Sequence, residues 1–230
     1  MSAPRRGLVL GKFMPPHLGH LYLTEFAQAH VDHLTVVVGS LAREPIAGEL
    51  RHRWMSELLP RATVVHLTDE LPQDPSEHPD FWTLWREALR RVLPGPVDEV
   101  FASEPYGERL ARELGASFVP VDIARAAVPV SGTAIRTDPM RHWDYLPRCV
   151  RPYFARRVCV FGPESTGKST LAARLAAHYA TVCVPEYART YLEARAGHLT
   201  ADDLEPIARG QLASDEALSR NANRLVVSDT

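Results

Sequence analysis

Short apolar runs alternate with segments of helical spacing along the whole chain. Leu8–Leu10 and Leu34–Gly39 are apolar runs typical of buried parallel strands. Helical spacing follows each of them, over 21–29 and 49–59. Further expected elements are strands at 62–67, 99–102 and 117–121, and helices at 80–92 and 108–114. This alternation predicts a right-handed parallel sheet that binds ligands at the carboxyl ends of its strands.

The alternation restarts after residues 139–157, a stretch rich in aromatic, proline and basic residues that reads as a closing helix and connector. The later pattern predicts strands at 158–161, 181–184 and 225–228, and helices at 169–179, 187–195 and 203–221. We therefore expect two α/β domains, 1–154 and 155–230.

The first expected strand leads into Gly11–His20, which reads Gly-Lys-Phe-Met-Pro-Pro-His-Leu-Gly-His. Two histidines at a strand-to-helix turn lie where free helix N–H groups favour a phosphate, and Lys12 adds a positive charge. A second stretch, Ser131-Gly-Thr-Ala-Ile-Arg136, also follows a strand, so both can face one crevice. The alternative, ordinary helix-start histidines beside a solvated lysine, is disfavoured because the two motifs occur together.

The second domain opens with a complete phosphate-loop motif. Gly162-Pro-Glu-Ser-Thr-Gly-Lys-Ser169 lies between a strand and an apolar-periodic helix, as G-x-x-x-x-G-K-S requires. Lys168 and Ser169 are the expected partners of phosphate and Mg²⁺, and Asp229 at the end of the last strand is a second candidate for Mg²⁺. Thr170 is expected to be a structural helix residue.

Composition narrows the function classes. The 230 residues are 45% hydrophobic and 23% charged, with a formal net charge of −2, which gives no reason to expect nucleic-acid binding. No apolar run approaches the ~20 residues of a membrane span. The three cysteines lack metal-ligand spacing, so we expect reduced thiols, a cytoplasmic location and no dedicated metal cluster.

The first domain's motifs resemble the HxGH nucleotidyltransferase superfamily. Their combination with the phosphate loop and Pro185-Glu-Tyr-Ala-Arg189 resembles the bifunctional NadR-type family along essentially the whole chain. That resemblance implies a Rossmann-like HxGH domain followed by a P-loop kinase domain. It also implies a nicotinamide-mononucleotide adenylyltransferase coupled to a ribosylnicotinamide kinase. The expected partners are ATP with Mg²⁺, nicotinamide mononucleotide and nicotinamide riboside, and we expect a homo-oligomer.

Adenylyl transfer needs no general base, because the attacking phosphate is already ionised and the enzyme must mainly balance charge. By the resemblance, the residues expected to be catalytic are Lys12, His17, His20 and Arg136. Those expected to bind ATP beside them are Gly11, Phe13, Gly19, Ser131 and Thr133. The kinase phosphate loop comprises Gly162, Glu164, Ser165, Thr166, Gly167, Lys168, Ser169 and Thr170. Glu186 and Arg189 follow a strand and are candidates for riboside binding, with a surface salt bridge between them as the alternative.

Two departures from the family qualify these expectations. Only seven residues precede the first expected strand, so we expect no helix-turn-helix and no DNA-binding role. The kinase half ends near Asp229, so we expect it to be incomplete and without useful ribosylnicotinamide kinase activity in this chain. The rival functions are a pantetheine-phosphate adenylyltransferase and a nucleotide-sensing regulator with a non-catalytic kinase-like domain.

Other residues near the motifs each have two possible roles. Trp82 and Trp85 could stack on a nicotinamide ring, although core packing at i, i+3 is favoured. Arg51 is as well explained by a solvated helix surface as by phosphate binding. Glu104 and Tyr106 follow a strand end and are candidates for the border of the adenine pocket, with loop packing an equal alternative.

Overall fold

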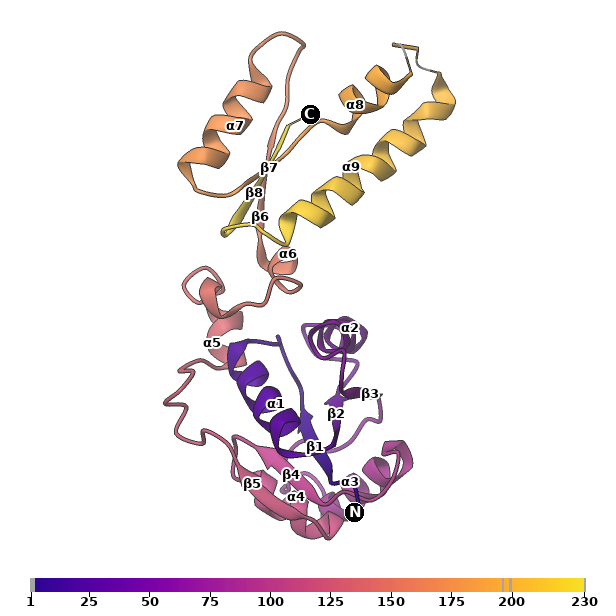
Figure 1. Ribbon diagram of the computed structural model, residues 1–230, viewed down its shortest axis with the longest axis vertical. Helices are drawn as coiled ribbons and strands as arrows, with labels where there is room; N and C mark the ends of the chain where they lie inside the picture. The colour runs from indigo at the N-terminus through magenta and orange to yellow at the C-terminus, as the bar shows by residue number, and fades with distance from the viewer. Residues whose placement is uncertain (1–2, 196, 199, 230) are drawn as a thin grey trace. The chain divides into compact units, whose positions relative to one another are not determined.

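A computed structural model describes residues 3–195, 197–198 and 200–229 of the chain. Thr230, the last residue of the predicted second domain, lies outside the described residues. The described part confirms the predicted α/β class, with two parallel sheets (Figure 1). Within it, no helix combines the length and apolar character that a bilayer crossing requires.

The first sheet has five parallel strands in the order β3-β2-β1-β4-β5. Its strands are β1 (Arg6–Gly11), β2 (His33–Gly39), β3 (Thr63–Leu67), β4 (Glu99–Ala102) and β5 (Ser117–Pro120). The order reverses between β1 and β4, and the crevice at such a switch point is where parallel sheets bind ligands. The Gly11–His20 segment leaves β1 at this point.

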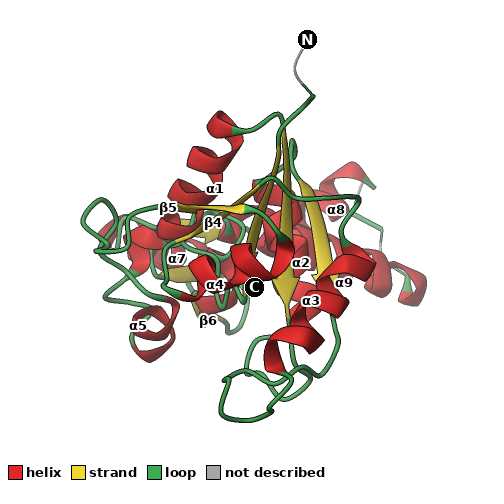
Figure 2. Cartoon of the chain, turned by 90° about the horizontal axis from the view of Figure 1, so that it is seen from below, coloured by secondary structure: helices red, strands yellow, loops and turns green. Residues whose placement is uncertain are grey.

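Helices cover both faces of the first sheet. The helices of this part are α1 (Leu18–His30), α2 (Gly48–Leu58), α3 (Phe81–Val92) and α4 (Tyr106–Leu114). Leu23 of α1 and Met55 of α2 pack in one apolar cluster, whereas Leu89 of α3 and Leu110 of α4 pack in another. In Figure 2, β4 and β5 lie between α1 and α4. The two clusters bury the sheet on both sides, which accounts for the continuous apolar strands in the sequence.

The Ser131–Arg136 motif forms a helix. Ser131 is the N-cap of α5 (Gly132–Thr137), and its hydroxyl accepts a hydrogen bond from the Ala134 N–H at 3.1 Å. The 139–157 stretch, expected to contain a closing helix, forms the short helices η1 (Trp143–Tyr145) and α6 (Arg151–Phe154), and a strand begins at Arg156. Pro147 and Pro152 limit longer helices there, since proline lacks a donor N–H.

The second sheet has three parallel strands in the order β6-β8-β7. These strands are β6 (Arg156–Val160), β7 (Val182–Val184) and β8 (Leu225–Asp229). The helices of this part are α7 (Lys168–His178), α8 (Tyr187–Ala194), η2 (Ala201–Asp203) and α9 (Leu204–Ser219). In Figure 1, α7 and α9 lie on opposite sides of this sheet. The predicted strands and helices of the second domain are thus confirmed within one or two residues at most ends.

The chain forms two compact units. The first comprises residues 1–138 and 144–147, and the second comprises residues 139–143 and 148–230. Trp143 is buried in the second unit, where its Nε1 donates to the Ala222 carbonyl at 3.2 Å. The domain boundary after residue 154 stays a prediction.

Candidate active site

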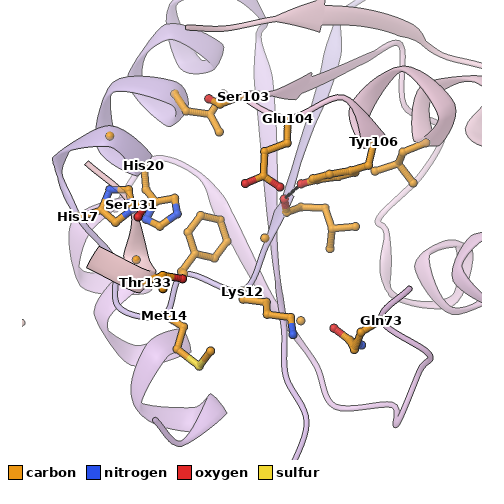
Figure 3. A pocket seen from close by; sticks show the side chains of 18 of the residues that line it. Lys12, Met14, His17, His20, Gln73, Ser103, Glu104, Tyr106, Ser131 and Thr133 are labelled. Carbon is orange, nitrogen blue, oxygen red and sulfur yellow. Dashed lines mark hydrogen bonds between the residues drawn. The ribbon is translucent and has the colours of Figure 1, made fainter. Parts of the chain in front are cut away.

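The first unit contains a pocket of about 650 Å³ at the carboxyl ends of its strands. The pocket brings together all nine residues predicted for the adenylyltransferase site. They are Gly11, Lys12, Phe13, His17, Gly19, His20, Ser131, Thr133 and Arg136. Figure 3 labels Lys12, His17, His20, Ser131 and Thr133 among them. Their chemical roles stay predictions, but their convergence follows from the parallel sheet.

His17 and His20 form a stacked pair at the start of α1. Their ring centroids lie 3.7 Å apart, and the Phe13 ring meets His20 edge-on at 4.9 Å. The Nδ1 atoms of both histidines are buried and have no hydrogen-bond partner among the described residues. Since unpaired buried polar atoms are costly, these nitrogens are candidates for hydrogen bonds to a ligand.

Both histidines are neutral at pH 7. Burial, with a smaller contribution from the Arg125 charge, lowers the pKa of His17 to about 4. Burial, followed by the charges of His17 and Arg125, places the pKa of His20 well below its usual range. The pair can therefore donate hydrogen bonds to a phosphate, while the positive charge of the pocket comes from lysine and arginine side chains.

Lys12 is held by two residues that the motifs do not include. Its Nζ lies 2.9 Å from Glu44 Oε1, and Glu44 Oε2 lies 2.5 Å from the guanidinium of Arg51. Arg51 is completely buried and donates to the backbone carbonyls of Lys12, Gly39 and Ile46. Burial alone would raise the pKa of Glu44, but the Leu41 N–H, Lys12 and Arg51 together lower it. Arg51 therefore supports the loop that carries Lys12, and the expectation of a solvated helix surface is wrong, whereas phosphate binding by Arg51 stays a prediction.

Arg136 faces the same loop from α5. It donates to the Met14 carbonyl and to the Thr133 hydroxyl, the latter at 3.1 Å. A Cβ atom on Gly132 would lie 2.7 Å from the Met14 carbonyl oxygen, so a glycine permits this close approach. The approach fixes the distance between the two motifs of the pocket.

An aromatic wall closes the other side of the pocket. Trp82 and Trp85 line it from α3 and also pack on the apolar cluster beneath the sheet, so core packing describes only part of their environment. The Trp85 Nε1 donates to the Pro72 carbonyl at 2.8 Å, which fixes its ring. Tyr106, which lines the pocket with Glu104, donates its hydroxyl to the Leu10 carbonyl at 2.6 Å.

The phosphate loop of the second unit joins β6 to α7. Gly167 has a φ of 86°, a left-handed conformation that glycine adopts without strain. Lys168 Nζ donates to the Pro163 carbonyl at 2.9 Å, so its ammonium lies over the loop itself. Glu186 and Arg189 form an ion pair at 3.7 Å, which is the salt bridge expected as the alternative to riboside binding. Riboside binding by these two residues stays a prediction.

Asp229, the candidate for Mg²⁺ binding, lies at the end of β8. Asp229 is opposite Val160 in the register of β6 and β8, at the end of β6 where the loop toward α7 begins. Its Oδ1 is buried and has no hydrogen-bond partner among the described residues. Carboxylate oxygens suit Mg²⁺, so Asp229 stays a candidate for this role. In the described part of the chain, no cluster of three or more acidic, histidine or cysteine side chains forms a separate metal site.

Comparison with known proteins gives relatives for both units. A family model described as an AAA domain matches residues 157–230. The trifunctional NAD biosynthesis/regulator protein NadR of Escherichia coli is 30% identical over 97% of this chain, which spans 60% of that relative. A nicotinamide-nucleotide adenylyltransferase of Aeropyrum pernix is 30% identical over 57% of this chain, which here covers 77% of the relative.

The chain is also similar to solved structures of NadR proteins. A NadR protein crystallised with NAD and AMP-PNP matches the whole chain with a TM-score of 0.80 and 26% identity, over 70% of its own length. A NadR protein in complex with NR matches with a TM-score of 0.78, the same identity and the same coverage of both chains. The chain is homologous to NadR along its length, although it spans only about 60% of the Escherichia coli protein, and its first unit is of the nucleotidyltransferase type.

Proposed function

We propose that the first unit transfers the adenylyl group of ATP to nicotinamide mononucleotide and so forms NAD and pyrophosphate. The observation that carries this proposal is the stacked, neutral pair His17 and His20. Both residues line a pocket whose other walls supply Lys12 and Arg136, and their Nδ1 atoms are buried without a partner among the described residues. The archaeal relatives are named for the same reaction.

The reaction joins two anions. A phosphate oxygen of the mononucleotide attacks the α-phosphorus of ATP, the bond from that phosphorus to the bridging oxygen breaks, and pyrophosphate leaves. We assign His17 and His20 to the α-phosphate, as neutral hydrogen-bond donors that need no proton change. Arg136 and the Ser131–Thr133 turn take the β- and γ-phosphates, and Lys12 balances charge as pyrophosphate departs. Mg²⁺ supplies further neutralisation of the triphosphate when it is bound with ATP.

The aromatic wall gives a place for the pyridine ring. Trp82 and Trp85 present indole rings to the pocket beside Phe81, and a cationic ring is attracted to an aromatic face. Because the hydrogen bond to Pro72 already fixes the Trp85 ring, stacking on it costs little side-chain entropy. A pantetheine chain carries no such ring, so this wall favours the nucleotide acceptor.

The direct test is an acceptor comparison. The full chain, ATP and Mg²⁺ are incubated with nicotinamide mononucleotide, nicotinate mononucleotide or phosphopantetheine, and product and pyrophosphate are measured. We expect turnover with the pyridine nucleotides, and a smaller kcat/KM for phosphopantetheine. Turnover with phosphopantetheine alone would contradict the proposal.

For the second unit we propose binding of Mg²⁺ and ATP by the phosphate loop, supported by the unpartnered Asp229 oxygen and by the NadR structure crystallised with AMP-PNP. Titration with ATP in wild type and Lys168→Ala tests binding, and equal affinity in both would contradict it. Phosphorylation of nicotinamide riboside, with the same variant as the blank, separates a kinase from a module that binds ATP without turnover.

A further inference from the structure

The charge on the pocket walls points to a residue outside both motifs. Among the described residues that line the pocket, the lysine and arginine side chains are Lys12, Arg125 and Arg136. The two histidines beside them are neutral at pH 7, since burial lowers the pKa of each. Two bound phosphate compounds bring several negative charges, and transfer between them needs fixed positive groups. Arg125 is the one of the three cations for which no role has been described above.

The loop after β5 fixes Arg125 at the pocket. The Asp122 carboxylate accepts hydrogen bonds from the N–H groups of Ala126, Ala127 and Val128, at 2.7 to 3.3 Å. The Arg125 N–H donates to the Asp122 carbonyl at 2.8 Å. The same loop continues into Ser131–Arg136, and Arg125 lines the pocket together with Ser131, Thr133 and Arg136.

Arg125 is held more weakly than the other two cations. Lys12 pairs with Glu44, whose side chain is only 6% exposed, and Arg136 is bonded to Met14 and Thr133. Arg125 contacts Glu104 at 3.2 Å in a pair whose side chains are 42% and 56% exposed. An ion pair of this kind contributes little, so a phosphate can replace the carboxylate at low cost. Figure 3 shows the Glu104 side chain at the pocket.

We propose that Arg125 is a further ATP phosphate-binding residue of the first unit, and that Glu104 holds it until ATP displaces the carboxylate. This inference rests on the proposed adenylyl transfer. In this arrangement the Glu104 carboxylate and the ATP phosphates compete for the Arg125 guanidinium. Loss of the arginine and loss of the Glu104 charge should therefore change ATP affinity in opposite directions.

The test compares Arg125→Gln, Arg125→Lys and Glu104→Gln with wild type. Glutamine is chosen at 125 because the residue has a φ of 51°, and glutamine bears a backbone cost similar to that of arginine. The matched control is Arg112→Gln, because Arg112 forms a similar exposed pair with Glu108 but does not line the pocket. Circular dichroism checks that each variant folds.

In steady-state NAD formation, Arg125→Gln should raise the KM for ATP about ten- to a hundredfold, the usual effect of one charged hydrogen bond. The KM for ATP of Arg125→Lys should lie between those of wild type and Arg125→Gln. Glu104→Gln should lower the KM for ATP about two- to fivefold. The KM for nicotinamide mononucleotide should change less than twofold in each variant. In the control Arg112→Gln, the KM for ATP should also change less than twofold. Arg125→Gln within twofold of wild type, an unchanged or raised KM in Glu104→Gln, or a change confined to the mononucleotide would each overturn the inference.

Equilibrium binding separates this inference from the proposed reaction. ATP is titrated by calorimetry into the same variants, each carrying Lys168→Ala to weaken the phosphate loop of the second unit. If wild type forms no NAD but Arg125→Gln still loses ATP affinity, the reaction is wrong and the role of Arg125 holds. If NAD forms and all variants bind ATP equally, the role of Arg125 is wrong and the reaction holds.

Discussion

Glu44→Gln tests how the loop that carries Lys12 is held. The Glu44 side chain is 6% exposed, Arg51 is fully buried, and their charged atoms lie 2.5 Å apart. Glutamine keeps the size of the side chain and one oxygen acceptor but removes the charge. Arg51 then stays in the interior with uncharged partners only, so the variant should unfold more easily.

The structure sets the expected magnitude. Leaving one member of a buried ion pair without its partner costs about 3–5 kcal/mol. Arg51 keeps its bonds to the carbonyls of Lys12, Gly39 and Ile46, so we expect the lower end, about 3 kcal/mol. The Lys12 side chain is 46% exposed, and its share of the pair adds less than about 1 kcal/mol. For a unit of this size, the Tm should fall by about 6–12 °C.

Thermal and urea unfolding of the full chain, followed by tryptophan fluorescence, measures this change. Three of the four tryptophans, Trp54, Trp82 and Trp85, lie in the first unit, so its transition dominates the signal. The control is Glu108→Gln, which removes an exposed pair and should cost less than about 0.5 kcal/mol. Equal unfolding free energies for the two variants at pH 7 would refute the buried-pair reasoning.

The pH dependence gives a second readout of the same variant. The pKa of Glu44 lies below its ordinary value of 4.5 in the folded protein. A lowered carboxyl pKa contributes stability that is present above the ordinary value and lost as the pH falls through the folded one. The difference between wild type and Glu44→Gln should therefore be constant from pH 7 to about 5 and shrink below it. A difference that persists undiminished to pH 3 would contradict the ion-pair origin.

Three further predictions concern the site and the two units. Arg136→Ala should raise the KM for ATP more than the KM for the mononucleotide. Arg136→Lys should restore the KM for ATP only in part, because the point charge of an ammonium does not replace a planar guanidinium. A larger change in the KM for the mononucleotide would show that Arg136 is assigned to the wrong substrate. Because burial lowers the pKa of His17 to about 4, kcat/KM should show no histidine titration between pH 6 and 8 and should fall only toward pH 4, so an acid limb near pH 6.5 would contradict a neutral pair. A fragment ending at Phe154 should keep adenylyl transfer but be less soluble than one ending at residue 147, because it carries the additional residues 148–154 of the second unit without the rest of that unit; equal solubility would argue against that division.

The sequence was sufficient for elements whose signal is local. Val36, Val37 and Val38 form a continuous apolar strand because both faces of β2 are covered, and the spacing of the two phosphate motifs placed them at strand ends. Residues whose role depends on contacts distant in sequence could not be assigned. Arg51 is 39 residues from the Lys12 carbonyl that it binds, so a buried arginine looked like a surface helix residue.

For two residues of the site, Glu44 and Arg125, the sequence contains only weak indications of a role. Glu44 lies in a turn with no motif around it, and its importance arises only when the chain brings Lys12 and Arg51 to it. Arg125 follows Asp122 by three residues, and that spacing is typical of a turn held by its own carboxylate. A charged residue held by such a turn just before a phosphate motif is therefore worth treating as a site candidate.

The measurement that tests the central claim most directly is formation of NAD and pyrophosphate from ATP and nicotinamide mononucleotide by wild type and His20→Ala. Removing one preorganised donor of this kind costs about 10²–10³ in kcat. His33→Ala is the matched control, since His33 is exposed at the amino end of β2. We predict stoichiometric NAD and pyrophosphate from wild type and the control, and a kcat at least about a hundredfold lower for a folded His20→Ala. A folded His20→Ala within threefold of wild type would contradict the account.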